Sequence, residues 1–234
     1  MLFRSWSSGK VALEQREVRF QLSLPAREGQ RQDFSVPVIS PDGKRIAVVL
    51  GNEGERKVWI RDLNSVSAHV LELSDPQANA DGGPFWSPDG QWVAYRADGK
   101  LKKISVNGGP PVTICDLDGG NAGTWGTDGT ILVAGPRRPL RRVMDSGGPL
   151  TTVVELDAGH NDAGTFLPNF LPDGRFLYIL RSDKTHSGVY LASLNDPKGR
   201  LVRPLPSLAE TNVIESFSVV GPSPGTSMAH LLYV

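Results

Sequence analysis

The chain has 234 residues, of which 39% are hydrophobic and 21% charged, and its 25 basic and 25 acidic side chains cancel to a formal net charge of zero. This composition excludes an intrinsically disordered chain, and the lack of a basic excess argues against a nucleic-acid binder held by phosphate contacts. The single cysteine, Cys115, excludes an internal disulfide framework, and the 26 glycines and 18 prolines predict many tight turns.

The N-terminal residues 1–16 are expected to form a tail or linker. They lack the apolar segment of a signal peptide. The longest apolar run in the chain, residues 46–50, is far shorter than the roughly 20 residues that a membrane-spanning helix needs. We therefore expect neither a signal peptide nor a membrane span in this sequence.

A four-residue turn motif recurs along the chain at nearly constant spacing. It occurs as SPDG at residues 40–43 and 87–90, as LPDG at 171–174, and in a degenerate form, GTDG, at 126–129. The aspartates at positions 42, 89, 128 and 173 are therefore 47, 39 and 45 residues apart. Such a period is typical of propeller repeats of about 40–50 residues. In this motif proline sets φ of the second turn position, aspartate bonds the local backbone, and glycine adopts a positive φ that closes a hairpin.

Each turn is followed by a segment rich in Val, Ile, Trp, Phe and Tyr, which is typical of a strand. These second strands are predicted at residues 44–50, 91–97, 130–134 and 175–181. Third strands are predicted at 57–63, 100–106, 139–145 and 188–194, and fourth strands at 68–73, 112–116, 151–156 and 201–205. Their alternating apolar residues are predicted to form the core: Ile46, Val48, Val93, Tyr95, Ile131, Val133, Leu177 and Ile179.

Four strands in each repeat predict an all-β fold, a β-propeller of four-stranded antiparallel blades. The units are placed at about residues 25–75, 76–117, 118–157 and 158–206, within a propeller domain spanning 17–234, and a partial fifth unit covers 207–234. Residues 18–24 alternate like a strand, and residues 231–234 are expected to form the second strand of the fifth unit. About four and a half blades are thus expected, as part of a larger six- or seven-bladed ring. The alternative is an irregular four- or five-bladed ring that closes on itself.

Residues 85–95, FWSPDGQWVAY, resemble the repeat of TolB-type, WD-repeat-like propellers. The longer segment 85–111, with ADGKLKK at 97–103 and GGPP at 108–111, resembles more narrowly the C-terminal propellers of bacterial eukaryotic-type serine/threonine kinases. The resemblance covers roughly residues 17–234 and implies a sensor or interaction role outside the cytoplasm or in the periplasm. The sequence itself contains none of the kinase motifs.

No catalytic or metal-binding motif survives inspection. Residues 221–225, GPSPG, match the G-x-S-x-G pattern, but Pro224 lacks the backbone N–H that an oxyanion hole requires at that position. Residues 116–121, DLDGGN, lack the glycine and glutamate of a calcium loop and are expected to form turns. The four histidines show no metal-ligand spacing, with His160 expected in a loop that enters a blade, and Cys115 is expected to be a small buried hydrophobe. We therefore expect no catalytic residue, no cofactor and no metal.

Two surfaces are candidates for partner binding. By family analogy, the loops that enter the innermost strands line the channel rim of a propeller, and here these loops are residues 81–84, 121–124 and 163–169. The candidate rim residues are Asp81, Asn121, Thr124, Thr165 and Asn169. The second is a candidate basic patch on outer strands, which is either a solvated face or a site for an acidic partner or membrane surface. It consists of Lys102, Lys103, Arg137, Arg138, Arg141 and Arg142.

The sequence thus predicts a non-catalytic propeller that binds an unidentified protein, peptide or small ligand at its rim, as the sensor portion of a bacterial signalling protein. No nucleic acid is expected as a partner. The alternative is a propeller fragment of a prolyl-oligopeptidase-like serine peptidase or of a TolB-type periplasmic translocation protein. In either case any kinase or peptidase activity would lie in a domain that this sequence does not contain.

Overall fold

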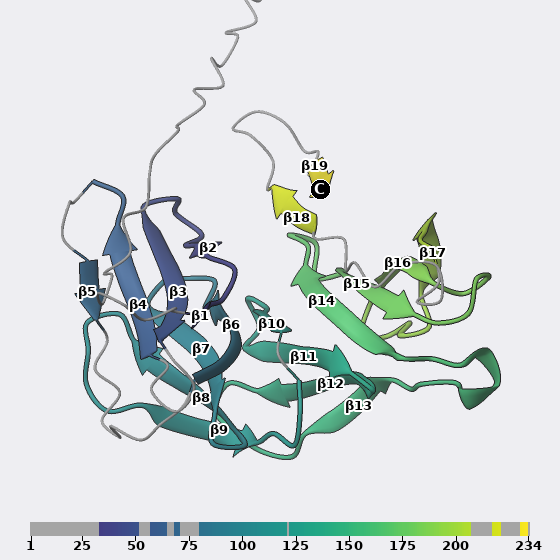
Figure 1. Ribbon diagram of the computed structural model, residues 1–234, viewed down its shortest axis with the longest axis horizontal. Helices are drawn as coiled ribbons and strands as arrows, with labels where there is room; N and C mark the ends of the chain where they lie inside the picture. Colours follow the sequence, from purple (N-terminus) through teal and green to yellow (C-terminus); the bar gives the residue numbers. More distant parts are fainter. Residues whose placement is uncertain are drawn as a thin grey trace, which may run out of the picture. The chain divides into compact units, whose positions relative to one another are not determined.

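The computed structural model describes residues 33–51, 57–64, 68–70, 80–120, 122–206, 217–220 and 230–233. In these ranges the regular elements are β-strands and one 3₁₀ turn, η1 (Ala158–His160), and all strand pairs are antiparallel (Figure 1). None of the described residues belongs to a helix long and apolar enough to span a membrane.

Four successive sheet segments form the fold, and the third and fourth of them belong to one eight-stranded sheet. The first contains β1 (Asp33–Phe34), β2 (Val38–Ile39), β3 (Arg45–Gly51), β4 (Lys57–Asp62) and β5 (Ala68–Val70). The second contains β6 (Ala80–Trp86), β7 (Trp92–Ala97), β8 (Lys100–Ser105) and β9 (Val112–Asp116). The third contains β10 (Ala122–Trp125), β11 (Thr130–Pro136), β12 (Arg138–Met144) and β13 (Thr151–Val154). The fourth contains β14 (Gly164–Phe170), β15 (Phe176–Arg181), β16 (Gly188–Ala192) and β17 (Arg200–Pro204), and β18 (Phe217–Val220) and β19 (His230–Tyr233) form a further pair.

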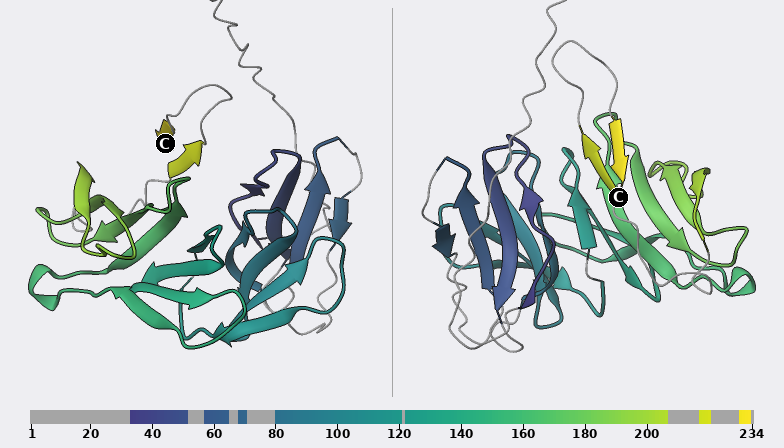
Figure 2. Two further views of the ribbon diagram at one scale, coloured as in Figure 1. Left: turned by 180° about the vertical axis from the view of Figure 1, so that it is seen from behind. Right: turned by 45° about the horizontal axis from the view of Figure 1, so that its top comes forward.

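These sheets correspond to propeller blades of four strands. In the first blade the innermost strand is interrupted, since β1 and β2 pair in turn with β3. The third and fourth blades are also joined by backbone pairing, because β11 pairs with β14 at Gly135–Thr165 and Pro136–Gly164. Figure 2 shows the blades from two further directions.

The recurrent turn motif acts as predicted. In the first copy Ser40 Oγ donates to Asp42 Oδ1, which also accepts from the Lys44 backbone N–H at 3.1 Å. The backbone N–H of Gly43 donates to Ser40 O at 2.8 Å. Gly43 has a φ of +70°, a backbone conformation that residues with a Cβ rarely adopt. Ser87 and Asp89 repeat the arrangement in the second blade. The motif therefore closes the hairpin between the first and second strands of a blade.

The core lies between consecutive blades. One cluster joins β3 and β4 to β7 and includes Val49, Val58 and Tyr95, and a second joins β7 and β8 to β11. A third joins β11 and β12 to β15, with Leu132 and Tyr178 fully buried. All six residues of β15 are buried, because both of its faces are covered. The predicted core residues are confirmed as buried: Ile46, Val48, Val93, Tyr95, Ile131, Val133, Leu177 and Ile179.

The predicted second, third and fourth strands are confirmed in all four units. Residues 71–73 of the strand predicted at 68–73 lie outside the described residues, and the other strand ends differ from the prediction by at most two residues. The strand expected near the C-terminus is β19, which pairs with β18. The strand expected at 18–24 and the motif at 221–225 lie outside the described residues. Cys115 is buried as expected, and burial raises the pKa of its thiol.

Candidate functional site

Four of the five candidate rim residues lie within strands, which corrects their assignment to loops. Asp81 belongs to β6, where its backbone pairs with Arg96, Thr124 belongs to β10, and Thr165 and Asn169 belong to β14. Asn121 lies outside the described residues. The register shifts between Asp81 and Phe85 and between Phe166 and Asn169, so β6 and β14 are bulged. A bulge accommodates Pro84 and Pro168, which cannot donate to a sheet ladder, and this is why a loop-like sequence forms a strand.

Two of these hydroxyl residues hold the third and fourth blades together. Thr165 is fully buried, and its Oγ1 donates to the carbonyl oxygen of Arg138 in β12 at 3.2 Å. Thr124 Oγ1 accepts a hydrogen bond from the backbone N–H of Phe170 at 3.2 Å. Both contacts cross from one blade to the next, so these side chains have a structural role.

The candidate basic residues make different local contacts. Arg141 and Arg138 both contact Asp118 and the backbone of residues 118–119, in the connection between β9 and β10. Lys103 lies over the rings of Trp92 and Trp125 and donates to Asp145 O at 2.8 Å.

The remaining basic residues also have separate environments. Lys102 pairs with Asp98 at 2.9 Å, whereas Arg142 and Arg137 are exposed. Arg137 has a φ of +55° in the β11–β12 turn. Several of these cations therefore stabilise connections between strands and blades.

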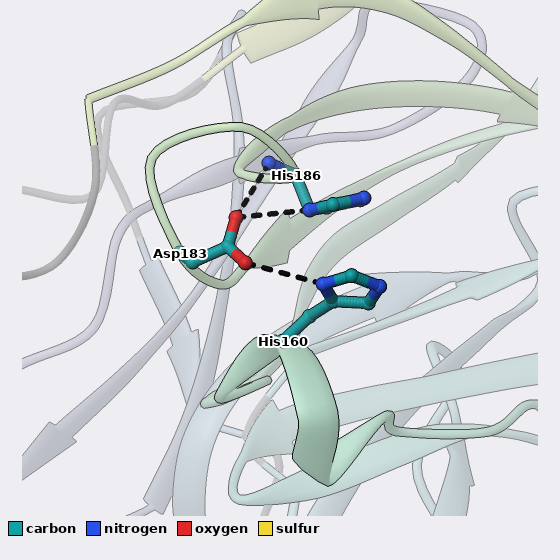
Figure 3. Close-up of side chains that lie close together, drawn as sticks. All are labelled: His160, Asp183 and His186. Carbon is teal, nitrogen blue, oxygen red and sulfur yellow. Dashed lines mark hydrogen bonds and ion pairs between the residues drawn. The ribbon is translucent and has the colours of Figure 1, made fainter.

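The structure brings together three side chains whose grouping the sequence did not indicate. His160, at the end of η1, Asp183 and His186 converge from two connections, the β13–β14 link and the β15–β16 hairpin (Figure 3). Asp183 Oδ2 lies 3.2 Å from His160 Nδ1, and Asp183 Oδ1 lies 2.9 Å from His186 Nδ1. The two imidazole rings are 3.6 Å apart between centroids. Between 31% and 43% of each side chain is exposed, so the group is accessible to solvent.

Local turn chemistry places His160. Asp157 caps the η1 turn, because its side chain accepts from the Gly159 backbone N–H at 2.7 Å. Asn161 ends the turn in the left-handed conformation, at φ 54° and ψ 42°. His160, predicted in a loop that enters a blade, is confirmed immediately before β14.

Asp183 organises the β15–β16 hairpin around its carboxylate. Asp183 Oδ1 accepts from the backbone N–H groups of Thr185 and His186, at 2.9 and 3.0 Å, and from Thr185 Oγ1 at 2.8 Å. Hydrogen bonds from His186 and Thr185 hold the pKa of Asp183 well below its usual range. The carboxylate is therefore ionised at neutral pH. Burial, with the charges of Asp162 and Asp183, raises the pKa of Tyr190.

The two connections are also tied through backbone groups. The Asp183 N–H and the Ser182 hydroxyl both donate to His160 O, at 2.9 and 2.8 Å. Tyr190 Oη donates to His186 O at 2.9 Å. The result is a platform, defined here as His160, Asp157, Asp183, Thr185 and His186, whose two halves are fixed to each other.

Sequence inspection missed this grouping because His160 and Asp183 are 23 residues apart. Only the three-residue spacing of Asp183 and His186 was visible, and that spacing alone is common in turns. The blade repeat could have indicated it. In a blade of antiparallel strands, the link into the first strand and the hairpin between the second and third strands lie at the same end of the sheet, and His160 lies in that link while Asp183 and His186 lie in that hairpin.

No protein-family model matches the chain. Among solved structures it is similar to a putative TolB from Agrobacterium tumefaciens, with 20% identity, a TM-score of 0.52, and coverage of 70% of this chain and 59% of that one. TolB from Acinetobacter baumannii matches with 15% identity and a TM-score of 0.55, over 74% of this chain and 44% of that one. A prolyl endopeptidase matches with 13% identity and a TM-score of 0.53, over 81% of this chain and 31% of that one. These similarities support the TolB-like propeller fold, and the chain spans about 60% or less of the length of each of these proteins.

Proposed function

We propose that the chain is a non-catalytic binding module, which presents the platform to a peptide or small ligand. The observation that carries this proposal is the set of hydrogen bonds that joins the β13–β14 link to the β15–β16 hairpin while leaving their side chains partly exposed. A rigid loop surface loses little conformational freedom on binding.

The chemistry of the platform indicates its ligand class. Asp157 and Asp183 provide acceptor oxygens, with 64% and 31% of their side chains exposed. Asp162 adds a further carboxylate in the β13–β14 link, and its Oδ2 accepts from the Asp157 backbone N–H at 2.7 Å. Such a surface favours a ligand with hydrogen-bond donors and positive charge, for example a peptide with a lysine or arginine.

For the biological context we propose the extracytoplasmic sensor portion of a bacterial serine/threonine kinase. The support is the resemblance of residues 85–111 to such propellers. The alternative contexts are a TolB-type translocation protein and a serine peptidase, and the structural similarity to TolB and prolyl endopeptidase supports these two at the level of the fold. Kinase motifs and a membrane span encoded upstream would favour the first context, whereas a hydrolase domain encoded downstream would favour the peptidase.

The binding proposal is tested with a random peptide library selected against the immobilised 234-residue chain in the presence of a chelator. We expect enrichment of basic peptides, whose affinity falls about fivefold in Asp157→Asn. That variant removes one charge but keeps the acceptor that caps η1. The matched control is Asp116→Asn, an 87% exposed aspartate in β9.

Three results would overturn the binding proposal. These are failure to enrich any peptide, equal loss of affinity in both variants, and hydrolysis of chromogenic peptide substrates by the chain.

A further inference from the structure

The His160, Asp183 and His186 side chains have the composition of a metal site. One nitrogen from each imidazole and one carboxylate oxygen lie within 4.8 Å of one another. Two histidines and one carboxylate are a common protein ligand set for Zn²⁺ and related divalent first-row ions. Three protein ligands leave at least one coordination position for water or an exogenous ligand.

The distances fit such an ion. With Zn–N and Zn–O bonds of about 2.1 Å, the ligand atoms of a tetrahedral site are about 3.4 Å apart. The Asp183 carboxylate oxygens lie 3.2 and 2.9 Å from the nearer nitrogens of His160 and His186. These two contacts involve different oxygens of the carboxylate, so side-chain rotations would bring one oxygen and the two ring nitrogens around an ion. Both rings already direct Nδ1 towards the carboxylate (Figure 3).

The surroundings hold the ligands in place. Hydrogen bonds to the carbonyl oxygens of His160 and His186 fix the backbone on both sides of the group. Asp157 Oδ2 lies 3.7 Å from His160 Nε2, so a second carboxylate is near the ring nitrogen opposite the one that faces Asp183.

We propose that His160, Asp183 and His186 bind one divalent ion of the Zn²⁺ class, with an open coordination position that faces solvent. The ion would link the β13–β14 connection to the β15–β16 hairpin. This inference goes beyond the binding-module proposal and does not depend on it, since it concerns metal affinity alone and the peptide selection is done in chelator.

The proposal is tested by titrating ZnCl₂ into the metal-free 234-residue chain at pH 7.5 in a calorimeter. We expect one ion per chain, and a Zn²⁺ affinity that falls at least about tenfold in His160→Gln and in His186→Gln. The matched control is His69→Gln, because His69 lies in β5 of a different blade. The Zn²⁺ affinity of this variant should equal that of the unchanged chain. Thermal melts in chelator establish that each variant folds.

Three results would overturn the proposal: no stoichiometric Zn²⁺ binding, unchanged affinity in both His160→Gln and His186→Gln, and an equal loss of affinity in the His69→Gln control. If a variant fails to fold, the visible spectrum of the Co²⁺-loaded unchanged chain decides the question. Bands of low-symmetry nitrogen and oxygen coordination support the site, whereas the spectrum of hexaaqua Co²⁺ contradicts it.

Discussion

At the scale of single residues, similar side chains in one strand have different roles. Arg141 in β12 is 12% exposed and holds the β9–β10 connection through Asp118 and the carbonyl oxygen of Gly119. The adjacent Arg142 is exposed, and its Nε lies 3.4 Å from Thr151 Oγ1. Arg141 contacts Asp118, 23 residues away in the sequence, whereas Arg142 contacts Thr151, nine residues away.

The two arginines give a matched pair of substitutions. We expect Arg141→Gln to lower the free energy of unfolding by about 1–2 kcal/mol, because two charge-assisted hydrogen bonds to the connection are lost while Asp118 remains largely solvated. Arg142→Gln should change it by less than about 0.5 kcal/mol. Urea denaturation followed by circular dichroism measures both values. Equal effects would show that Arg141 has no special role.

Sequence inspection offered a solvated face or a partner site for the basic residues and could not choose between them. The ambiguity had a physical origin. The partners of Arg141 come from the β9–β10 connection, and the indole rings around Lys103 come from β7 and from β10 in the next blade. Such contacts depend on register and on blade-to-blade packing. Neither is encoded in the local composition of β12 or β8.

At the scale of elements, strands buried on both faces distinguish this fold from a sheet with one solvated face. In β11, Ile131 belongs to the cluster shared with the second blade, whereas Leu132 belongs to the cluster shared with the fourth. Both side chains are fully buried although they point to opposite faces.

This double burial predicts that neighbouring substitutions in β11 are equally costly. Ile131→Ala and Leu132→Ala should each lower the free energy of unfolding by about 2–5 kcal/mol, because each leaves a cavity between two blades. Val112→Ala, at a position that is 46% exposed, is the control and should cost less than about 1 kcal/mol. Chemical denaturation of the three variants provides the comparison. A small effect at either buried position would show that one face of β11 is not packed.

Strand order and core could be predicted from the sequence because the Pro-Asp-Gly turns recur at a fixed period and are followed by β-formers. The innermost strands were predicted less well, since β6 contains Gly82, Gly83 and Pro84, residues that normally end a strand. The bulge that admits them is set by pairing with β7. The platform could not be predicted, because it depends on the packing of two connections from different parts of the repeat.

At the scale of the whole molecule, a small number of aspartates make the stability of the fold depend on pH. Among the residues that the structure describes, five aspartates have a pKa below the usual value: Asp42, Asp89, Asp118, Asp173 and Asp183. The leading cause in each is a side-chain hydrogen bond, for instance from Ser87 to Asp89 and from Arg141 to Asp118. Three of the five lie in the recurrent turn, so the repeat that specifies the fold also distributes this effect over three blades.

The sign of the pH dependence follows from these shifts. A carboxyl whose pKa is lower in the folded than in the unfolded chain stabilises the fold above the unfolded value, about 3.9, and this contribution is lost as the pH falls through the folded value. We therefore expect the urea midpoint to fall steeply below about pH 4. Asparagine at positions 42, 89 and 173 together should reduce the midpoint at pH 7 and flatten its decline between pH 5 and pH 3, since these side chains would no longer take up protons on unfolding. If the urea midpoint of this triple variant declined between pH 5 and pH 3 as steeply as that of the unchanged chain, the pH dependence would come from residues outside the turns.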